Sequence, residues 1–496
     1  MSFGPPPSIY TESARVADES RTRRRRRRIG GVAAAAVALC LGAGLVVWVQ
    51  SGDDGNDKSG PVAVEQAPDE IRETVEKAPS SPEGQIVVEQ KEAKLTADTR
   101  YAPGTWATGK ILARGVKNRI EGYKIEPDGG DTAWTLKLDG HICATSRDVT
   151  ADGRTAVVVQ TAHVNDEGAK MCDEVVFVDL NTGKKVWQQK MPGADFAYVT
   201  NTNIALTKGV VAVAWGKGSV AYGMDKGKRL WNTTIASECH DMGYAGGRAL
   251  LALVTCGRSS DTTYRVEKLD ARTGKVVWKY QVARGIQGVY LASSEPPVVA
   301  VEAGDIDVTD LITLDGKSGE RTATISMSGF DPKCGRTTYD NGFFGVVDKC
   351  DGVVVGRDRL FVMSKEGTDI KQPSDQIVAF DVKSGATAGK FWGRPFQMVI
   401  PVRMNGDDLI LYRRSIDDVQ PAAVVDWNPR TDKETPYLLF QLPEDDEDTL
   451  SDPEQSDIVY EQGHVFFGPR ALERDDKNPT YPVLSVMGVG SAGLKH

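Results

Sequence analysis

The 496-residue chain has few of the residue types that carry most enzymatic and metal chemistry. It contains five His and seven Cys, with no adjacent cysteines and no Cys-x-x-Cys or His-Glu-x-x-His pattern. Phosphate-binding glycine loops of the Walker type and the Gly-x-Ser-x-Gly nucleophile elbow are also missing from the sequence. The sequence therefore gives no support to the common zinc sites, to nucleotide hydrolysis or to serine hydrolase chemistry.

The chain also lacks long apolar runs, with one exception at its start. Ile29 to Val49 contains no charge and follows six consecutive arginines, Arg23 to Arg28. As a helix it would rise about 31 Å, enough to cross a bilayer. The positive-inside rule then predicts a disordered basic tail over 1–28 in the cytoplasm, a transmembrane helix over 29–49, and export of all that follows. A cleaved signal peptide and a lipoprotein signal around Cys40 are the alternatives.

The exported part has little positive charge to offer a nucleic acid. The whole chain carries a formal charge of −9, and residues 1–28 hold eight Arg and three acidic residues, so the remainder carries −14. This balance argues against a nucleic-acid-binding surface. Residues 50–100, rich in Gly, Pro, Ser, Asp and Glu, indicate a flexible extracytoplasmic stalk in which Asp69 to Lys77 could form a short helix.

What the chain does have is a recurring phrase: an apolar strand, an Asp, a Gly turn and a second strand that often ends in Trp. The spacings between the repeated Asp residues are 46, 45, 45, 66 and 45, a period typical of propeller blades. The phrase predicts a β-hairpin in which Asp caps the turn, Gly supplies a positive φ and Trp packs between neighbouring blades. Its residues are Asp179, Gly183, Trp187, Asp225, Trp231, Asp270, Gly274, Trp278, Asp315, Gly319, Asp381 and Gly385, with Asp426 in a weak copy and Trp134 following Glu126 in a seventh.

The expected fold is all-β, a propeller of eight four-stranded blades over residues 101–496, with seven blades as the alternative. A degenerate eighth copy lies at His464 to Phe467 and Val483 to Met487. A propeller must pair its first and last segments, because an open ring would leave exposed edge strands. Strands near Trp106 to Arg114 are the expected partners. The 66-residue spacing indicates one blade with an insertion of about 21 residues.

Six cysteines fall in the exported part, which agrees with an oxidising compartment. Fifteen pairings are possible. The repeat frame places the first member of each local pair at the start of a blade and its partner before the next phrase, which predicts Cys143–Cys172, Cys239–Cys256 and Cys334–Cys350. A zinc site is the alternative.

The phrase Asp-x-x-Thr-Gly-Lys-x-x-Trp resembles the PQQ-like, or quinoprotein-type, propeller repeat, over about Thr105 to Gly490. This family includes quinoprotein alcohol dehydrogenases and a propeller lipoprotein of outer-membrane assembly. The resemblance implies that an active quinoprotein would stack its quinone between a Trp and an adjacent-cysteine disulfide and would hold Ca²⁺ with Glu, Asn and Asp. This chain has no adjacent cysteines, and no catalytic, cofactor or metal residue can be carried over by motif.

The sequence therefore favours a membrane-anchored, non-catalytic scaffold that binds an envelope protein or a surface ligand. A PQQ- and Ca²⁺-dependent oxidoreductase and a sensor that recruits a cytoplasmic partner are the alternatives. Two acidic groups are possible calcium ligands, Asp305, Asp307 and Asp310 in one and the run Glu444 to Asp448 in the other, although solvated loops explain both. The ligand and the oligomeric state are not specified by the sequence.

Overall fold

The structure is a computed structural model, and it describes the chain from residue 66 to residue 492 with short gaps. The gaps are 94, 96–98, 126–128, 166–167, 235–237, 258–261, 305–306, 336–346, 368–372, 417–419, 445, 475–477 and 479. The expected tail and transmembrane helix, with Cys40, Glu126 and Asp305, lie outside the described residues. No helix in the described part is long and apolar enough to cross a membrane.

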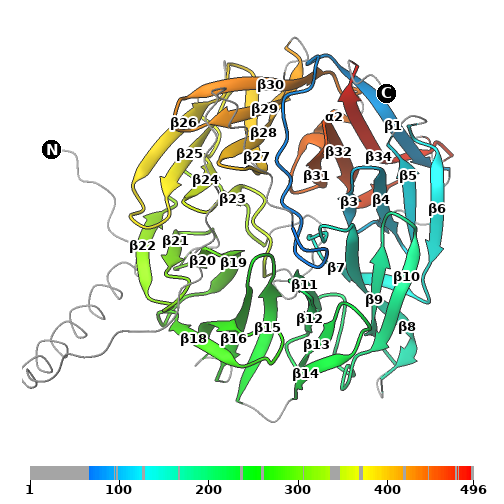
Figure 1. The fold of residues 1–496 in the computed structure, drawn as a ribbon, viewed down its shortest axis with the longest axis vertical. Coiled ribbons are helices and arrows are strands. Elements are labelled where there is room, and N and C mark those ends of the chain that lie inside the picture. The colour runs from blue at the N-terminus through cyan, green and yellow to red at the C-terminus, as the bar shows by residue number, and fades with distance from the viewer. Residues whose placement is uncertain are drawn as a thin grey trace, which may run out of the picture. The chain divides into compact units, whose positions relative to one another are not determined.

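Eight four-stranded antiparallel sheets surround a common centre as the blades of a propeller (Figure 1). Blades 1 to 3 contain β3 (Thr105–Ala107), β4 (Ile111–Val116), β5 (Arg119–Lys124), β6 (Thr132–Lys137); β7 (His141–Thr145), β8 (Arg154–Val164), β9 (Lys170–Asp179), β10 (Lys184–Lys190); and β11 (Asn203–Thr207), β12 (Val210–Ala214), β13 (Ser219–Gly223), β14 (Arg229–Thr233). Blades 4 and 5 contain β15 (Cys239–Ala245), β16 (Leu250–Cys256), β17 (Thr263–Leu269), β18 (Val276–Gln281); and β19 (Gly288–Ser294), β20 (Pro297–Glu302), β21 (Asp310–Leu314), β22 (Arg321–Ser326).

The remaining blades complete the ring, and eight blades are confirmed. Blades 6 to 8 contain β23 (Val353–Val355), β24 (Arg359–Met363), β25 (Gln376–Asp381), β26 (Thr387–Trp392); β27 (Gln397–Asn405), β28 (Asp408–Ser415), β29 (Ala422–Asn428), β30 (Lys433–Phe440); and β31 (Ser456–Glu461), β32 (His464–Pro469), β34 (Val483–Ser491), β1 (Gly84–Glu92). A short helix, α2 (Glu447–Ser451), precedes blade 8, and β2 (Thr99–Tyr101) pairs with β33 (Ala471–Glu473).

The ring closes through β1, and this corrects two expectations. β1 pairs with β34 from Gly84↔Ser491 to Glu92↔Val483 and forms the outer strand of blade 8. The segment Trp106 to Arg114, expected to close the ring, instead spans the two inner strands of blade 1. The propeller also begins before residue 101, because β1 belongs to the range expected to be stalk. The physical reason is that β34, buried along most of its length, needs an outer partner.

The repeated phrase forms the hairpin between the third and fourth strands of a blade. Asp179, Asp270, Asp315 and Asp381 each accept hydrogen bonds from backbone N–H groups two or three residues later. Hydroxyl and backbone donors of Thr273, Ser318 and Ser384 lower the pKa of the last three carboxyls. Asp225 lies in the corresponding turn, between β13 and β14.

Three tryptophans of the phrase form a hydrogen bond with the next blade. The Nε1–H groups of Trp187, Trp231 and Trp278 donate to the carbonyls of Met224, Ala271 and Gly316 at 2.8–3.0 Å. The ring of the Trp lies against the turn glycine of that next blade. A Cβ added at Gly183, Gly274 or Gly319 would come within 2.3–2.9 Å of Trp134, Trp231 or Trp278, and these glycines have φ of +67° to +69°. The glycines therefore serve both the turn and the packing.

Blades 6 and 7 depart from this pattern. Trp392, which ends the copy in blade 6, is 64% exposed. Trp427 of blade 7 instead packs back on Phe391 and Phe361, with ring centroids 5.5 and 5.9 Å away. The turn cap of blade 7 is Asn428, whose Oδ1 accepts from the N–H groups of Arg430 and Thr431.

Asp426, the repeated Asp of that copy, is therefore not the turn cap. It lies within β29 and accepts a hydrogen bond from the Tyr437 hydroxyl (3.1 Å). Burial, followed by the nearby charge of Asp408, raises the pKa of Asp426 to about 6. The period of 45 alone cannot distinguish this residue from the turn cap two positions later.

Candidate functional site: the turn face and the centre of the propeller

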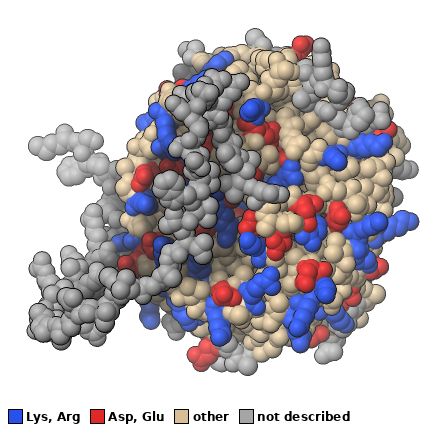
Figure 2. Space-filling model, in the orientation of Figure 1, with Lys and Arg blue, Asp and Glu red and all other residues tan. Residues whose placement is uncertain are grey.

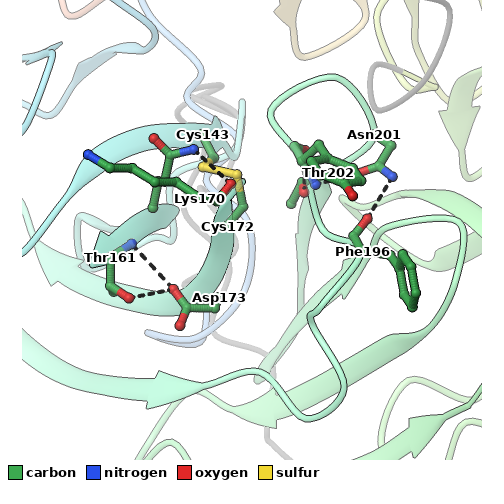
Figure 3. Close-up of a disulfide and its surroundings, with 10 residues drawn as sticks. Cys143, Thr161, Lys170, Cys172, Asp173, Phe196, Asn201 and Thr202 are labelled. Carbon is green, nitrogen blue, oxygen red and sulfur yellow. Dashed lines mark hydrogen bonds between the residues drawn. A yellow bond between two sulfur atoms is a disulfide. The ribbon is translucent and has the colours of Figure 1, made fainter. Parts of the chain in front are cut away.

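The predicted disulfide pairing is confirmed, and it stiffens the blades around the centre. Cys143–Cys172, Cys239–Cys256 and Cys334–Cys350 close loops with sequence separations of 29, 17 and 16. The first joins β7 to β9 within blade 2, beside the buried Asp173, which accepts from the N–H and Oγ1–H of Thr161 (Figure 3). Cys334 and Cys350 lie in the predicted insertion, between β22 and β23.

The end of this insertion, residues 347–351, lies near the centre of the ring, and we call it the axial segment. Its Val347 carbonyl accepts from the N–H of Leu291 in blade 5, and Asp348 accepts from Asn203 in blade 3 (3.2 Å). Asp351 pairs with Arg147 of blade 2 (3.2 Å) and with Arg470, which follows β32 of blade 8 (3.1 Å). One short segment thus contacts four different blades, as only a segment near the axis can.

Most charges around Asp351 of the axial segment are buried and paired with a charge of opposite sign. Arg470 also pairs with Asp457 (2.8 Å), and Lys349 lies 3.7 Å from Asp351. Burial alone would raise the pKa of Asp351, but the charges of Arg470, Lys349 and Arg147 hold it below its ordinary value. Asp148 has the opposite environment, since burial, and then the charge of Asp348, raise its pKa to about 7 against the effect of Arg147.

The second element near the centre is an extended segment, Gln66–Lys77, which we call the strap. It crosses the face that carries the turns between the first and second strands of the blades, which we call the turn face. In Figure 1 the blue chain ahead of β1 runs from the middle of the ring to its edge. The helix expected at Asp69 to Lys77 is not formed, because bonds to the propeller replace the few that a nine-residue helix offers.

Backbone bonds attach the first half of the strap to blades 2 and 3. The Arg72 N–H donates to the Val149 carbonyl (2.8 Å), and the Ala151 N–H donates to the Glu70 carbonyl (2.8 Å). The Gly209 N–H donates to the carbonyl of Asp69 (3.0 Å). Ile71 and Thr150 form an antiparallel bridge, so the strap pairs here like an added strand.

Ion pairs attach the strap to five blades, and two of these pairs are largely buried. Glu70 pairs with Lys208 (2.6 Å), and Glu73 pairs with Arg248 (2.5 Å) and Arg357 (3.6 Å). These pairs are exposed, and such pairs contribute about 0–1 kcal/mol each. The buried pairs are Arg72–Glu461 (2.6 Å) and Arg403–Glu76, with Glu461 and Glu76 each 8% exposed. They are the anchors, since separating a buried pair costs about 3–5 kcal/mol.

The electrostatic character of the turn face is mixed rather than of one sign. Figure 2 shows Lys and Arg interspersed with Asp and Glu over the face in view. Several acidic residues noted in the sequence are part of structural pairs. Asp448 pairs with Arg414, and Asp307 pairs with Lys365 (3.5 Å).

The residues at the centre do not fit a quinone with Ca²⁺. The carboxylate that the axial segment places there, Asp351, is matched by Arg470 and Lys349, and none of the three disulfides joins adjacent cysteines. Among the described residues no group of three or more His, Cys, Asp or Glu is placed to hold a metal ion. No reaction step through such a group follows from this arrangement.

Sequence reasoning located the hairpins, the tryptophans and the disulfides but missed the strap and the axial segment. The phrase residues are distributed around the ring as blade-to-blade contacts, and they are not brought together into one site. The alternation Arg72, Thr74, Glu76 was the available signal for the strap, since it places three polar side chains on one side of an extended chain.

An eight-bladed ring of four-stranded blades, tied by Asp-Gly turns and Trp contacts, defines a propeller of the PQQ-like repeat type. The model of the family described as outer membrane protein assembly factor BamB matches residues 72–237 and 171–434. The matches cover more than half of the chain, which therefore belongs to this family. No curated protein matches the chain.

Several solved structures resemble the fold at low sequence identity. BamB from Moraxella catarrhalis is 12% identical, with 82% of this chain and 99% of that chain covered and a TM-score of 0.42. Quinohemoprotein alcohol dehydrogenase ADHIIG from Pseudomonas putida HK5 is 12% identical, with 83% and 77% covered and a TM-score of 0.46. Sqt1 from Saccharomyces cerevisiae is 12% identical, with 81% and 99% covered and a TM-score of 0.41. These likenesses carry no argument about activity.

Proposed function

We propose that this protein is a scaffold of the cell envelope whose propeller binds another protein. The observation that carries the proposal is the strap, because the turn face holds an extended polypeptide through backbone bonds and ion pairs. The description of the family, an outer membrane assembly factor, supports a role in binding proteins. Eight blades that pack only on their neighbours provide a rigid support on which face residues can vary.

Site-specific cross-linking in intact cells tests the binding role. A photoreactive residue at Arg357, which is 78% exposed on the turn face, is expected to cross-link a discrete partner. The matched control is Val277, which is 58% exposed on β18 at the outer edge of blade 4. Equal and diffuse labelling at the two positions would contradict the proposal.

The anchor is a separate part of the proposal. Residues 29–49 hold the chain in the membrane, with residues 1–28 in the cytoplasm and the propeller outside, a location that the apolar run, the arginines and the three disulfides support. Deletion of 29–49 is expected to move the protein from the membrane fraction to the soluble fraction. Protease added to spheroplasts should degrade the propeller of the unaltered protein while cytoplasmic proteins stay intact, and protection of the propeller would contradict this topology.

A further inference from the structure

The strap contacts the propeller with a sequence-specific pattern, which its extended conformation explains. Arg72, Thr74 and Glu76 alternate along the chain, so they point to the same side, toward blades 7 and 8. Arg72 and the Thr74 hydroxyl both donate to Glu461, at 2.6 and 2.9 Å. The intervening Glu73 points toward Arg248 and Arg357 instead. The turn face at blades 7 and 8 therefore binds the pattern Arg-x-Thr-x-Glu in an extended chain.

The carboxylate of Glu76 lies in a cradle formed by the propeller. The successive N–H groups of Gln462 and Gly463 donate to its two oxygens, each at 2.7 Å. Both residues have positive φ, +46° and +77°, and consecutive N–H groups of such a turn form an anion-binding concavity. The guanidinium of Arg403 donates to the same carboxylate.

The propeller orients this cradle by contacts that do not involve the strap. Arg403 donates to the carbonyls of Tyr460 and Met404, both at 2.8 Å, and its guanidinium lies 5.4 Å from the centroid of the Tyr460 ring. Gln462 and Gly463 belong to the tight turn between β31 and β32. Removal of the strap thus leaves a formed site for a carboxylate, with Glu461 beside it for a cation.

The strap itself contributes little apolar burial to hold it in place. Val75 is 63% exposed, and Ile71 is the residue that packs against the core between blades 2 and 3. Its attachment depends on polar contacts that another peptide of the same pattern can reproduce. The strap has one advantage over a separate peptide, its covalent connection to the propeller, which gives it an effective concentration on the order of millimolar.

We propose that the strap occupies, within its own chain, a recognition site for an extended segment of the partner protein with the pattern Arg-x-Thr-x-Glu. This inference rests on the proposed function and adds the chemistry of the partner. The partner segment adds to blades 2 and 3 as a strand, places its carboxylate against Arg403, Gln462 and Gly463, and places its Arg on Glu461. The strap leaves when the partner segment binds.

A peptide of residues 66–77 carrying a fluorophore tests the proposal on the purified full chain. The variant Arg72→Ala with Glu76→Ala weakens the strap and is expected to bind the peptide at least about tenfold more tightly than the unaltered chain, because the competing tethered segment is gone. Adding Arg403→Ala to this variant should weaken binding about tenfold or more. Arg357→Ala, which removes an exposed contact, is the matched control and should change affinity less than about threefold.

The peptide itself supplies a second comparison. Replacing its last Glu, the counterpart of Glu76, by Gln should weaken binding, whereas the same change at the counterpart of Glu73 should have little effect. Thermal melting of each variant checks that the propeller remains folded.

A measurement on the unaltered chain avoids reliance on variants. While the strap is bound, the amide of Arg72 donates to the carbonyl of Val149 in blade 2. Excess unlabelled peptide should displace the strap and so speed hydrogen exchange at this amide. The proposal is overturned if folded strap-weakened protein shows no saturable binding up to about 1 mM peptide and the exchange is unchanged. It is also overturned if Arg403→Ala has no effect. Cross-linking at Arg357 could still capture a partner in that case, so failure of this inference is distinguishable from failure of the scaffold role.

Discussion

At the scale of the residue, one tryptophan in each of several blades joins that blade to the next. Its indole N–H finds a backbone carbonyl across the boundary, and its ring covers a glycine that has no room for a Cβ. The clusters of buried residues follow the same plan, because the cluster with Phe177 and Trp187 extends to Tyr222 in the next blade. Stability therefore depends on boundaries between blades.

Two tryptophans on the fourth strands of their blades, Trp187 and Trp392, should differ sharply in their effect on stability. Trp187→Ala removes a buried ring and a hydrogen bond to Met224, and it should lower the free energy of unfolding by about 3–5 kcal/mol. Trp392→Ala is the control, because that ring is 64% exposed, and it should change the value by less than about 0.5 kcal/mol. Urea unfolding measures both, and equal losses would contradict the role assigned to the boundary.

Asp148 predicts a pH dependence of stability. Its pKa is about 7 in the folded chain, above the ordinary value of 3.8, so the folded state binds the proton more tightly and loses stability as pH rises from about 4 to about 7. Asp148→Asn removes this loss and should be more stable than the unaltered protein by ~1–3 kcal/mol at pH 8, with little difference at pH 4.

Melting temperatures over this pH range measure the effect. The charge of Asp348, whose own pKa is raised by burial, enlarges the effect, and the charge of Arg147 opposes it. Asp358→Asn, at an exposed position on a turn, is the control and should leave the slope unchanged. If the melting temperature of Asp148→Asn falls with pH as steeply as that of the unaltered protein, other groups dominate the pH dependence of stability.

At the scale of the element, β1 and the strap are adjacent in the chain but have different roles. β1 completes blade 8 through a backbone ladder along β34, whereas the strap crosses the turn face through polar side chains. Removing the strap costs ion pairs, and removing β1 exposes the edge of a nearly fully buried strand.

Two truncations separate these roles. A chain that begins at residue 78 should remain folded and monodisperse, because β1 is retained. A chain that begins at residue 93 should aggregate, because β34 then presents unpaired backbone groups to solvent. Size-exclusion chromatography distinguishes the two, and a monodisperse product from the shorter chain would refute the closing role of β1.

The same contrast explains how much of the molecule can be predicted from sequence. Hairpins around Asp179 or Asp270 are local, since turn residues and strand partners lie within a dozen positions, and the phrase therefore predicts them. The partner of β1 lies about 400 residues away, and nothing in Gly84 to Glu92 indicates which strand it joins. The strap is polar and Pro-containing, so its composition suggests a linker. Its conformation is explained by distant partners, which are the turns of blades 2 and 3 and the side chains of Arg403 and Glu461.

At the scale of the whole molecule, the propeller is a ring of nearest-neighbour contacts braced at three places. Each disulfide closes a short loop, and such a loop contributes about 3 kcal/mol in the chain-entropy model. Cys239 and Cys256 lie opposite each other on paired strands of blade 4, so this bond reinforces one sheet. Cys334–Cys350 instead closes the loop that leads into the axial segment.

Replacing each pair with alanine should therefore give different results. Cys239→Ala with Cys256→Ala should lower the melting temperature and leave Arg147 and Arg470 in place. Cys334→Ala with Cys350→Ala should in addition loosen the axial segment, seen as faster hydrogen exchange at Leu291, whose N–H donates to Val347. Equal exchange at Leu291 in both variants would contradict this difference.

The position of the strap also determines how the propeller bears force. The first half of the strap is bonded to turns of blades 2 and 3, whereas β1 lies at the outer edge of blade 8. A pull on the chain ahead of Gln66 first loads the bonds of Asp69 and Glu70, then the anchor at Arg72, then that at Glu76. Because these contacts break one after another, the strap extends under tension before any force reaches the β1–β34 ladder. The ring itself is thereby shielded from mechanical opening.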